Sequence, residues 1–384
     1  MNLLDRYIFK SVLIASAGAV GLFAFVLTLG NVIRDLLGYL LTDQLSLPVF
    51  GELVLLTIAS VVIYALPMGI LTGVLLTLGQ LSADSEVTAM RAAGISLTRI
   101  ARPVLILALL AVVTGLYINF QSMPWAKTEY ERRWHEIARS NPLSFIVPRT
   151  FIRTFPGHVI YVGAKEGTVT RDIWVWDLDR EERAIRLTRA QSGRVDYDDN
   201  TNDLILTLTK GQYEPRNEKN PEDFSEAPPP FISFEISEPR RLSLNQLFHR
   251  DTPTQKLQWM TYGQLRAEQA RLAALPVPAD RAAAKEQART QMKVAFTVQE
   301  KFTLAFSMLS FALVGVPLGI KVSRRETSAN LGVAVLLVLG YYFLTTAVSW
   351  IDRHPEYRPD LLLWLPNLIF IAIGLWLFSR IEKK

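Results

Sequence analysis

The sequence has no cysteine and only four histidines among its 384 residues. It therefore has no disulfide framework, no thiolate metal site and no cysteine nucleophile. His135 and Glu136 lack the second histidine of an H-E-x-x-H zinc motif, and no G-x-x-x-x-G-K-[ST] phosphate loop occurs. We therefore expect no metal site, no ATP hydrolysis and no enzymatic activity in this chain.

Charged side chains are absent from six long stretches, although they make up 20% of the chain. Because about 20 apolar residues can cross a bilayer as a helix, these stretches predict an integral membrane protein. The net charge of +5 is modest, and basic residues cluster at the ends of the apolar runs, so we expect no nucleic-acid partner. The predicted spans are residues 12–33, 53–83, 103–123, 302–320, 327–351 and 361–379.

A short polar stretch, LGQLSADSEVTAMRAAGIS (78–96), joins the second and third predicted spans and carries Asp84, Glu86 and Arg91. It predicts a small helix at about 83–94, with Asp84 or Ser85 as its N-cap and Gly94 ending it in a left-handed turn. Ser96 is placed to cap the next helix. This stretch is either a connector lying on the membrane surface or a docking helix for a soluble partner.

The whole chain divides into four predicted parts. Residues 1–124 hold the first three spans, 125–260 a β domain, 261–300 a helical linker and 301–384 the last three spans. Segments such as DIWVWDLD and DLILTLTKGQYEP alternate apolar and polar residues, which is typical of short strands in a sandwich or jelly roll. Residues 217–230 are acidic and proline-rich and predict a flexible excursion. The expected fold class is a six-span (3+3) α-helical membrane protein with an inserted all-β, jelly-roll-like domain.

Two features of the predicted spans bear on packing and mechanism. Pro67 should kink the second span, and Gly69, Gly73 and Gly79 permit another helix to approach it closely. The span interiors are poor in ionisable residues, which argues against an ion-coupled secondary transporter.

Lysine and arginine in the short loops predict the orientation. One side carries 11 of them and the other only 3, namely Arg34, Arg353 and Arg358. Both termini and the 78–96 stretch are therefore expected in the cytoplasm, and the β domain outside, in the periplasm of a diderm bacterium. The 11 are Arg6, Lys10, Arg91, Arg99, Arg102, Lys321, Arg324, Arg325, Arg380, Lys383 and Lys384.

Several motifs resemble the LptF/LptG (YjgP/YjgQ) family of lipopolysaccharide-export permeases. The resemblance covers essentially the whole chain and includes LDRYIFK (4–10), ALPMGILTGVLLTLGQL (65–81) and NPLSF (141–145). Its most specific part is the D-S-E-x-x-A-x-R-x-x-G-I-S pattern between two spans.

The resemblance implies a permease subunit of an ABC transporter in the inner membrane. Two such permeases would pair above a cytoplasmic ATPase dimer, which binds ATP and Mg²⁺, so no cofactor is expected in this chain. The pair would extract lipopolysaccharide and pass it to a periplasmic bridge of jelly-roll proteins. Glu86 would contact the ATPase, and the contact would be shaped by Asp84, Ala89, Arg91 and Gly94.

The resemblance also implies that the first and fifth spans form lateral gates. Arg34 would then meet lipid A phosphates, or it is an ordinary interfacial anchor. Gly332 and Gly340 would allow close helix approach in the gate. Two alternatives remain: an ABC-type subunit that acts on lipoproteins or transmits force, and a membrane-anchored periplasmic scaffold or binding protein without an ATPase.

Overall fold

The fold comes from a computed structural model that describes most of the chain, in two compact units. A helical unit comprises Met1–Asp35, Glu52–Glu129 and Lys256–Lys384, and a β unit comprises Leu36–Gly51 and Tyr130–Gln255. The proline-rich segment 217–230 and the NPLSF motif lie outside the described residues. The described residues are 2–41, 45–140, 146–153, 155, 157–179, 183–198, 201, 203–215, 231–243, 256–276, 278, 280–322, 327–351 and 355–382.

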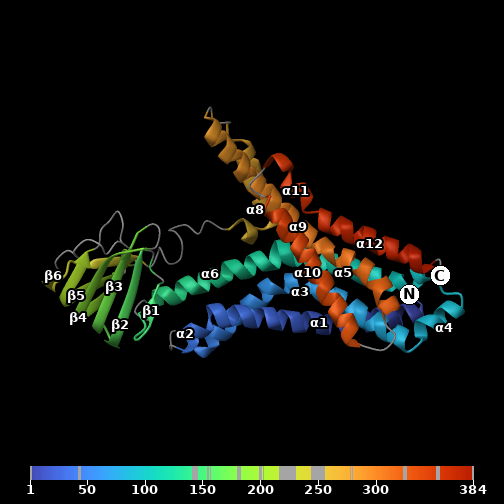
Figure 1. Cartoon of the computed structure of the whole chain (residues 1–384), viewed down its shortest axis with the longest axis horizontal. Helices are drawn as coiled ribbons and strands as arrows, with labels where there is room; N and C mark the ends of the chain where they lie inside the picture. The colour runs from blue at the N-terminus through green and yellow to red at the C-terminus, as the bar shows by residue number, and fades with distance from the viewer. Residues whose placement is uncertain are drawn as a thin grey trace, which may run out of the picture. The chain divides into compact units, whose positions relative to one another are not determined.

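Six helices are long and apolar enough to span a membrane, as the uncharged runs predict (Figure 1). The first four extend beyond their apolar runs, because polar and charged residues at the run ends continue the helical turns, whereas the fifth is shorter than its run. The third span begins with α5 (Leu97–Tyr117) and continues through a π-helical segment, η1 (Ile118–Ser122), into α6 (Met123–Ser140). The spanning helices are α1 (Leu3–Asp35), α3 (Leu47–Ala83), α5 (Leu97–Tyr117), α9 (Arg281–Val322), α10 (Thr327–Ser349) and α12 (Leu365–Glu382).

Shorter helices connect or flank the spans. Around the linker they are η3 (Leu257–Trp259) and α8 (Tyr262–Ala273), and α8 starts with a capping box between Thr261 and Gln264. The others are α2 (Leu37–Leu41), α4 (Glu86–Ala92), η4 (Pro355–Tyr357) and α11 (Pro359–Leu362).

Glycines on α3 bring α1 against it, as predicted for two of the three positions. A Cβ added at Gly69 would lie 2.7 Å from the backbone nitrogen of Val20, and one at Gly73 would lie 2.5 Å from the Cα of Ser16. Both distances are well inside van der Waals contact, so only glycine permits this approach of two helix backbones.

A buried lysine lies on α9, one residue before the predicted fourth span. Lys301 is only 4% exposed; its Nζ donates to the Asn119 carbonyl at 2.8 Å. The Asn119 side-chain amide in turn donates to the Lys301 carbonyl at 3.0 Å. The apolar run begins at 302, one residue after this lysine, whereas the spanning helix extends well before it. This reciprocal pair joins η1 to α9 and satisfies the buried ammonium group.

The β unit contains one antiparallel sheet in which consecutive strands are neighbours. Its order is β1-β2-β3-β4-β5-β6, and β7 pairs with β5 beside β6. This is the pattern of a meander, in which each strand turns directly back against the one before. The strands are β1 (Phe151–Ile152), β2 (His158–Glu166), β3 (Val169–Leu178), β4 (Ala184–Asp198), β5 (Asp203–Pro215), β6 (Ile232–Ile236) and β7 (Arg240–Ser243).

One face of this sheet is an apolar core, as the alternating strand pattern predicts. Ile160, Val162, Ile173 and Val175 are fully buried there together with aliphatic side chains of β4 and β5. An inserted antiparallel β domain is therefore confirmed. A jelly roll also needs Greek-key connections between two sheets, and the strands that the structure describes contain none.

An ion-pair cluster holds three strands together at one end of the sheet. Asp177 on β3 lies 2.9 Å from Nδ1 of His158 on β2 and 2.5 Å from a guanidinium nitrogen of Arg240 on β7. Burial would raise the pKa of the Asp177 carboxyl, but hydrogen bonds from His158 and Arg240 lower it below its ordinary value of 3.8. The folded carboxyl therefore stays ionised at a pH where the unfolded one takes up a proton.

Acidification should destabilise the β unit through Asp177. The contribution is fully present above the unfolded pKa and is lost as the pH falls through the lowered folded value. Asp177→Asn should cost about 1.5–3 kcal/mol at pH 7, the usual range for charge-assisted hydrogen bonds, and flatten the acid dependence. Thermal unfolding followed by near-ultraviolet circular dichroism at pH 7, 5 and 3 measures both effects. Asp196→Asn, at an exposed ion pair with Arg194, is the control. If Asp177→Asn loses stability on acidification as steeply as the wild type, Asp177 is not the group responsible.

Candidate functional site

The helix α4 (Glu86–Ala92) forms within the predicted polar stretch, between α3 and α5. Val87 and Met90 are buried and pack into a cluster that includes Leu78 and Leu81 of α3 and Ile100 of α5. The spacing of three residues between Val87 and Met90 places them on one helix face. The opposite side is exposed and carries Asp84, Thr88, Ala89, Arg91 and Gly94. The apolar face thus fixes α4 to two spans and leaves its polar face open.

The turns around α4 agree with the sequence in two positions and differ in one. Gly94 adopts a left-handed conformation with φ of 81°, and the Ser96 side chain accepts a hydrogen bond from the Arg99 nitrogen at the start of α5. Ser85 occupies the N-cap position of α4, but its φ is 62° and its side chain makes no capping bond. Ser85 therefore occupies the predicted N-cap position but does not supply a side-chain capping bond.

Glu86 contacts the N-terminal helix. The Tyr7 hydroxyl of α1 donates a hydrogen bond to Oε1 of Glu86 at 3.3 Å. The start of α1, α4 and the end of α12 lie at the same end of the helical unit (Figure 1). Tyr7 belongs to the LDRYIFK motif, but nothing in the spacing of residues indicates a contact across 79 positions. The carboxylate is therefore partly positioned by a helix that the sequence does not link to it.

A groove of about 670 Å³ lies beside α4, at the ends of three spans. Arg91 of α4, Lys321 of α9 and Arg380 of α12 line it, and no carboxylate does among the described residues. The Ser82 hydroxyl at the end of α3 donates to the Ile320 carbonyl at 2.8 Å and so ties α3 to α9 there. The polar face of α4 and this basic groove share Thr88 and Arg91, and the charge of the groove is complementary to acidic groups.

The predicted gate residues lie elsewhere in the helical unit. Gly332 and Gly340 are exposed on α10, and nothing described in this chain lies within 4 Å of a Cβ added at either. Leu336, Leu339 and Phe343 are exposed on the same face of α10. Arg34 belongs to the last turn of α1, and the prediction for its side chain falls outside the described residues. The structure thus does not bring these residues together with α4.

Cation sites are also missing from the described part of the chain. No group of three or more His, Asp or Glu side chains there can hold a metal ion.

Comparison with known proteins identifies the family. The family model "Lipopolysaccharide export system permease LptF/LptG" matches residues 6–380. Similar curated proteins include the lipopolysaccharide export system permease protein LptF of Escherichia coli K12, of Escherichia coli O157:H7 and of Shigella flexneri. Each is 21% identical over 321 residues, which is 81% of this chain and 76% of the relative. Because the match runs through all six spanning helices and the β unit, the chain belongs to the LptF/LptG family of lipopolysaccharide export permeases, which are multi-pass inner-membrane proteins.

Proposed function

We propose that this chain is the permease subunit of an ATP-driven lipopolysaccharide exporter whose ATPase docks on α4. The observation that carries the proposal is the arrangement of α4, with Val87 and Met90 anchored in the core and its polar face open. A short helix fixed to two spans can transmit closure of an ATPase as a rigid-body movement. ATP and Mg²⁺ would be bound by that ATPase.

The orientation follows from charge. The end of the helical unit that carries α4 also carries Arg91, Lys321 and Arg380, in agreement with the positive-inside rule. Both termini and α4 are therefore on the cytoplasmic side in this proposal, and the β unit is in the periplasm. The ATPase would bring acidic side chains to the basic groove and basic ones to Glu86.

The second permease would meet α1 and α10, which form the lateral gates. Both helices keep broad apolar surfaces exposed in this chain, including Phe25 and Leu22 of α1 and Leu336 and Phe343 of α10. The space around Gly332 and Gly340 leaves room for a partner helix to approach closely. Arg34, near the end of α1, would meet a lipid A phosphate there.

The β unit would pass the glycolipid to a periplasmic jelly-roll protein by edge-to-edge strand pairing. Its apolar core and its short edge strands, β1 on one side and β6 and β7 on the other, support this role. The jelly-roll form of the domain and the identity of the bridge belong to this proposal.

A tagged pull-down from native membranes in mild detergent tests the function. We expect mass spectrometry of the bound fraction to identify a small cytoplasmic ATPase, a second six-span permease and lipopolysaccharide. Lipoprotein in place of glycolipid would indicate an ABC-type subunit with another cargo. Copurification of neither ATPase nor second permease would overturn the proposal in favour of a membrane-anchored scaffold.

A further inference from the structure

A row of three aromatic and three polar side chains crosses the outer face of the sheet, opposite its apolar core. Directly paired residues on six strands form it, one from each of β1 to β6, and we call it the aromatic row. Its members are Phe151, Tyr161, Trp174, Arg189, Gln212 and Ser233. Ring centroids lie 5.2 Å apart for Phe151 and Tyr161 and 6.3 Å apart for Tyr161 and Trp174. The Arg189 guanidinium lies 4.0 Å from the centroid of the Trp174 ring.

A second row runs alongside at the level where the strand pairing is interrupted. The register on each pair of strands skips one residue here and then resumes, as between Val162–Ile173 and Ala164–Arg171. Asp172 and Lys210 each have a φ of 53°, in the left-handed region that is costly for residues other than glycine. The pairing resumes in the same register on both strands, so no β-bulge lies at this level. We call Asp172, Gln191, Lys210 and Glu235 the polar row.

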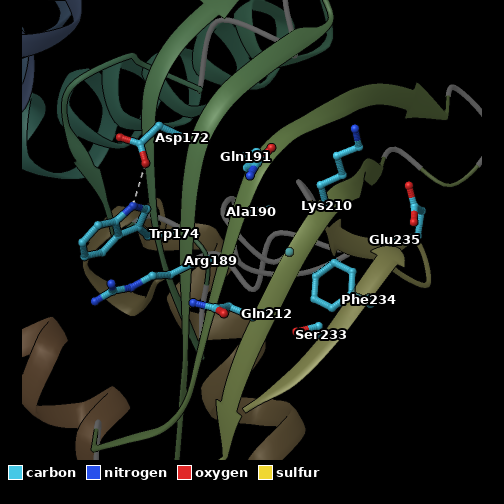
Figure 2. Close-up of a pocket in the computed structure, with 11 residues that line it drawn as sticks. Asp172, Trp174, Arg189, Ala190, Gln191, Lys210, Gln212, Ser233, Phe234 and Glu235 are labelled. Atoms are coloured by element: carbon cyan, nitrogen blue, oxygen red, sulfur yellow. Dashed lines mark hydrogen bonds between the residues drawn. The ribbon is translucent and has the colours of Figure 1, made fainter.

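The polar row and the part of the aromatic row from Trp174 to Ser233 line one shallow groove of about 770 Å³ (Figure 2), whereas Phe151 and Tyr161 lie outside its lining. Figure 2 shows Arg189 beside Trp174, and Lys210 and Glu235 on the other side of Gln191. The Trp174 indole nitrogen donates to Asp172 at 2.8 Å, which links the two rows and fixes the ring. The left-handed backbone at Asp172 and Lys210 and the hydrogen-bonded Trp174 ring indicate that this surface is formed before any ligand binds.

The chemistry of the groove fits a neutral, hydroxylated ligand. Two cations, Arg189 and Lys210, balance two carboxylates, Asp172 and Glu235, so the lining has no net charge. Gln191, Gln212 and Ser233 add amide and hydroxyl groups that both donate and accept hydrogen bonds. Trp174 and Phe234, the two aromatic residues in the lining, supply apolar ring surface for the C–H side of a sugar ring. A lipid acyl chain would leave these polar groups unpaired, and a polyanion would meet the two carboxylates.

We propose that this groove binds an oligosaccharide. That the sugar is the saccharide part of the exported glycolipid rests on the proposed function, whereas saccharide binding itself does not. The apolar core of the sheet and the groove would then contact chemically different parts of one amphiphile, from opposite faces.

Titration of the full-length protein in detergent with delipidated, dephosphorylated core oligosaccharide tests the proposal by calorimetry. Trp174→Ala and Arg189→Ala should each weaken binding about tenfold or more, because each removes stacking or several hydrogen bonds. Gln212→Ala should weaken binding about threefold, the size of one hydrogen bond. Arg194→Ala is the matched control, because Arg194 is also an exposed arginine of β4 and lies outside the groove. Its affinity should equal that of the wild type.

Three outcomes would overturn the proposal: no oligosaccharide binding by the wild type, equal binding by all groove variants that keep the wild-type circular dichroism, or displacement by equimolar inorganic phosphate. If Trp174→Ala fails to fold, Gln212→Ala carries the test, because Gln212 is exposed. Oligosaccharide binding without ATPase copurification would support the groove and reject the proposed function. ATPase copurification without oligosaccharide binding would support the proposed function and reject the groove.

Discussion

Glu86→Arg should release the ATPase from the purified complex while the permease stays folded. The reversed charge would face a basic residue of the docked protein, and it would also add to the positive groove formed by Arg91, Lys321 and Arg380. Disrupting one partner of a charge pair at an interface typically costs about 2–5 kcal/mol, and about 1.4 kcal/mol is tenfold in affinity. We therefore expect at least about a tenfold drop in ATPase recovered per permease, measured by quantitative mass spectrometry of the pull-down.

Two variants separate docking from internal packing. Tyr7→Phe removes the hydrogen bond to Glu86 but keeps the carboxylate, so it should retain most of the ATPase. Glu382→Arg places the same charge reversal at the exposed end of α12, outside the groove, and should behave like the wild type. Equal recovery of the ATPase with Glu86→Arg and wild type would mean that α4 is only a connector between spans.

Gly73→Leu should prevent the helical unit from assembling. Even a methyl group at Gly73 would lie 2.5 Å from the Ser16 Cα, so α1 and α3 would have to separate along their contact. Overpacking a well-packed site costs about 1–3 kcal/mol, and a clash with backbone leaves fewer ways to relax. Gly73→Ala should therefore lower the melting temperature in detergent measurably, and Gly73→Leu should abolish a monodisperse peak in size-exclusion chromatography.

Gly21→Ala is the matched control for this effect. Gly21 lies on the contacting helix α1, but nothing is within 4 Å of a Cβ added there, and alanine is the better helix former. Its melting temperature should equal or exceed that of the wild type. A normal melting temperature for Gly73→Ala would show that α1 and α3 pack differently in the membrane.

The sequence predicts best what depends on local pattern. The six spans follow from uncharged runs, α4 from a polar stretch between two of them, and the strands from period-two alternation, as in DIWVWDLD. Gly69 and Gly73 indicate a helix contact because small residues let two helix backbones approach closely. The partner helix, however, could not be named from these glycines alone.

Features that depend on distant pairing escaped prediction. The aromatic row exists only because the strand register aligns Trp174 with Tyr161 and Arg189, and register depends on turns that single-sequence patterns locate poorly. The contact of Tyr7 with Glu86 has the same origin. Lys301 was missed for a different reason: hydropathy finds the start of an apolar run, whereas helix packing decides where a charged residue can be buried.

The pairing of Lys301 with Asn119 also bears on how the chain enters the membrane during synthesis. An ammonium group at the edge of an apolar run disfavours insertion of that run, by less than the roughly 2.5–3.5 kcal/mol that a lysine at mid-membrane costs. Its acceptor carbonyl lies on η1, which the ribosome completes some 180 residues earlier, as the sequence separation of 182 shows. We therefore expect the first three spans to serve as the template on which the fourth is released from the insertion machinery.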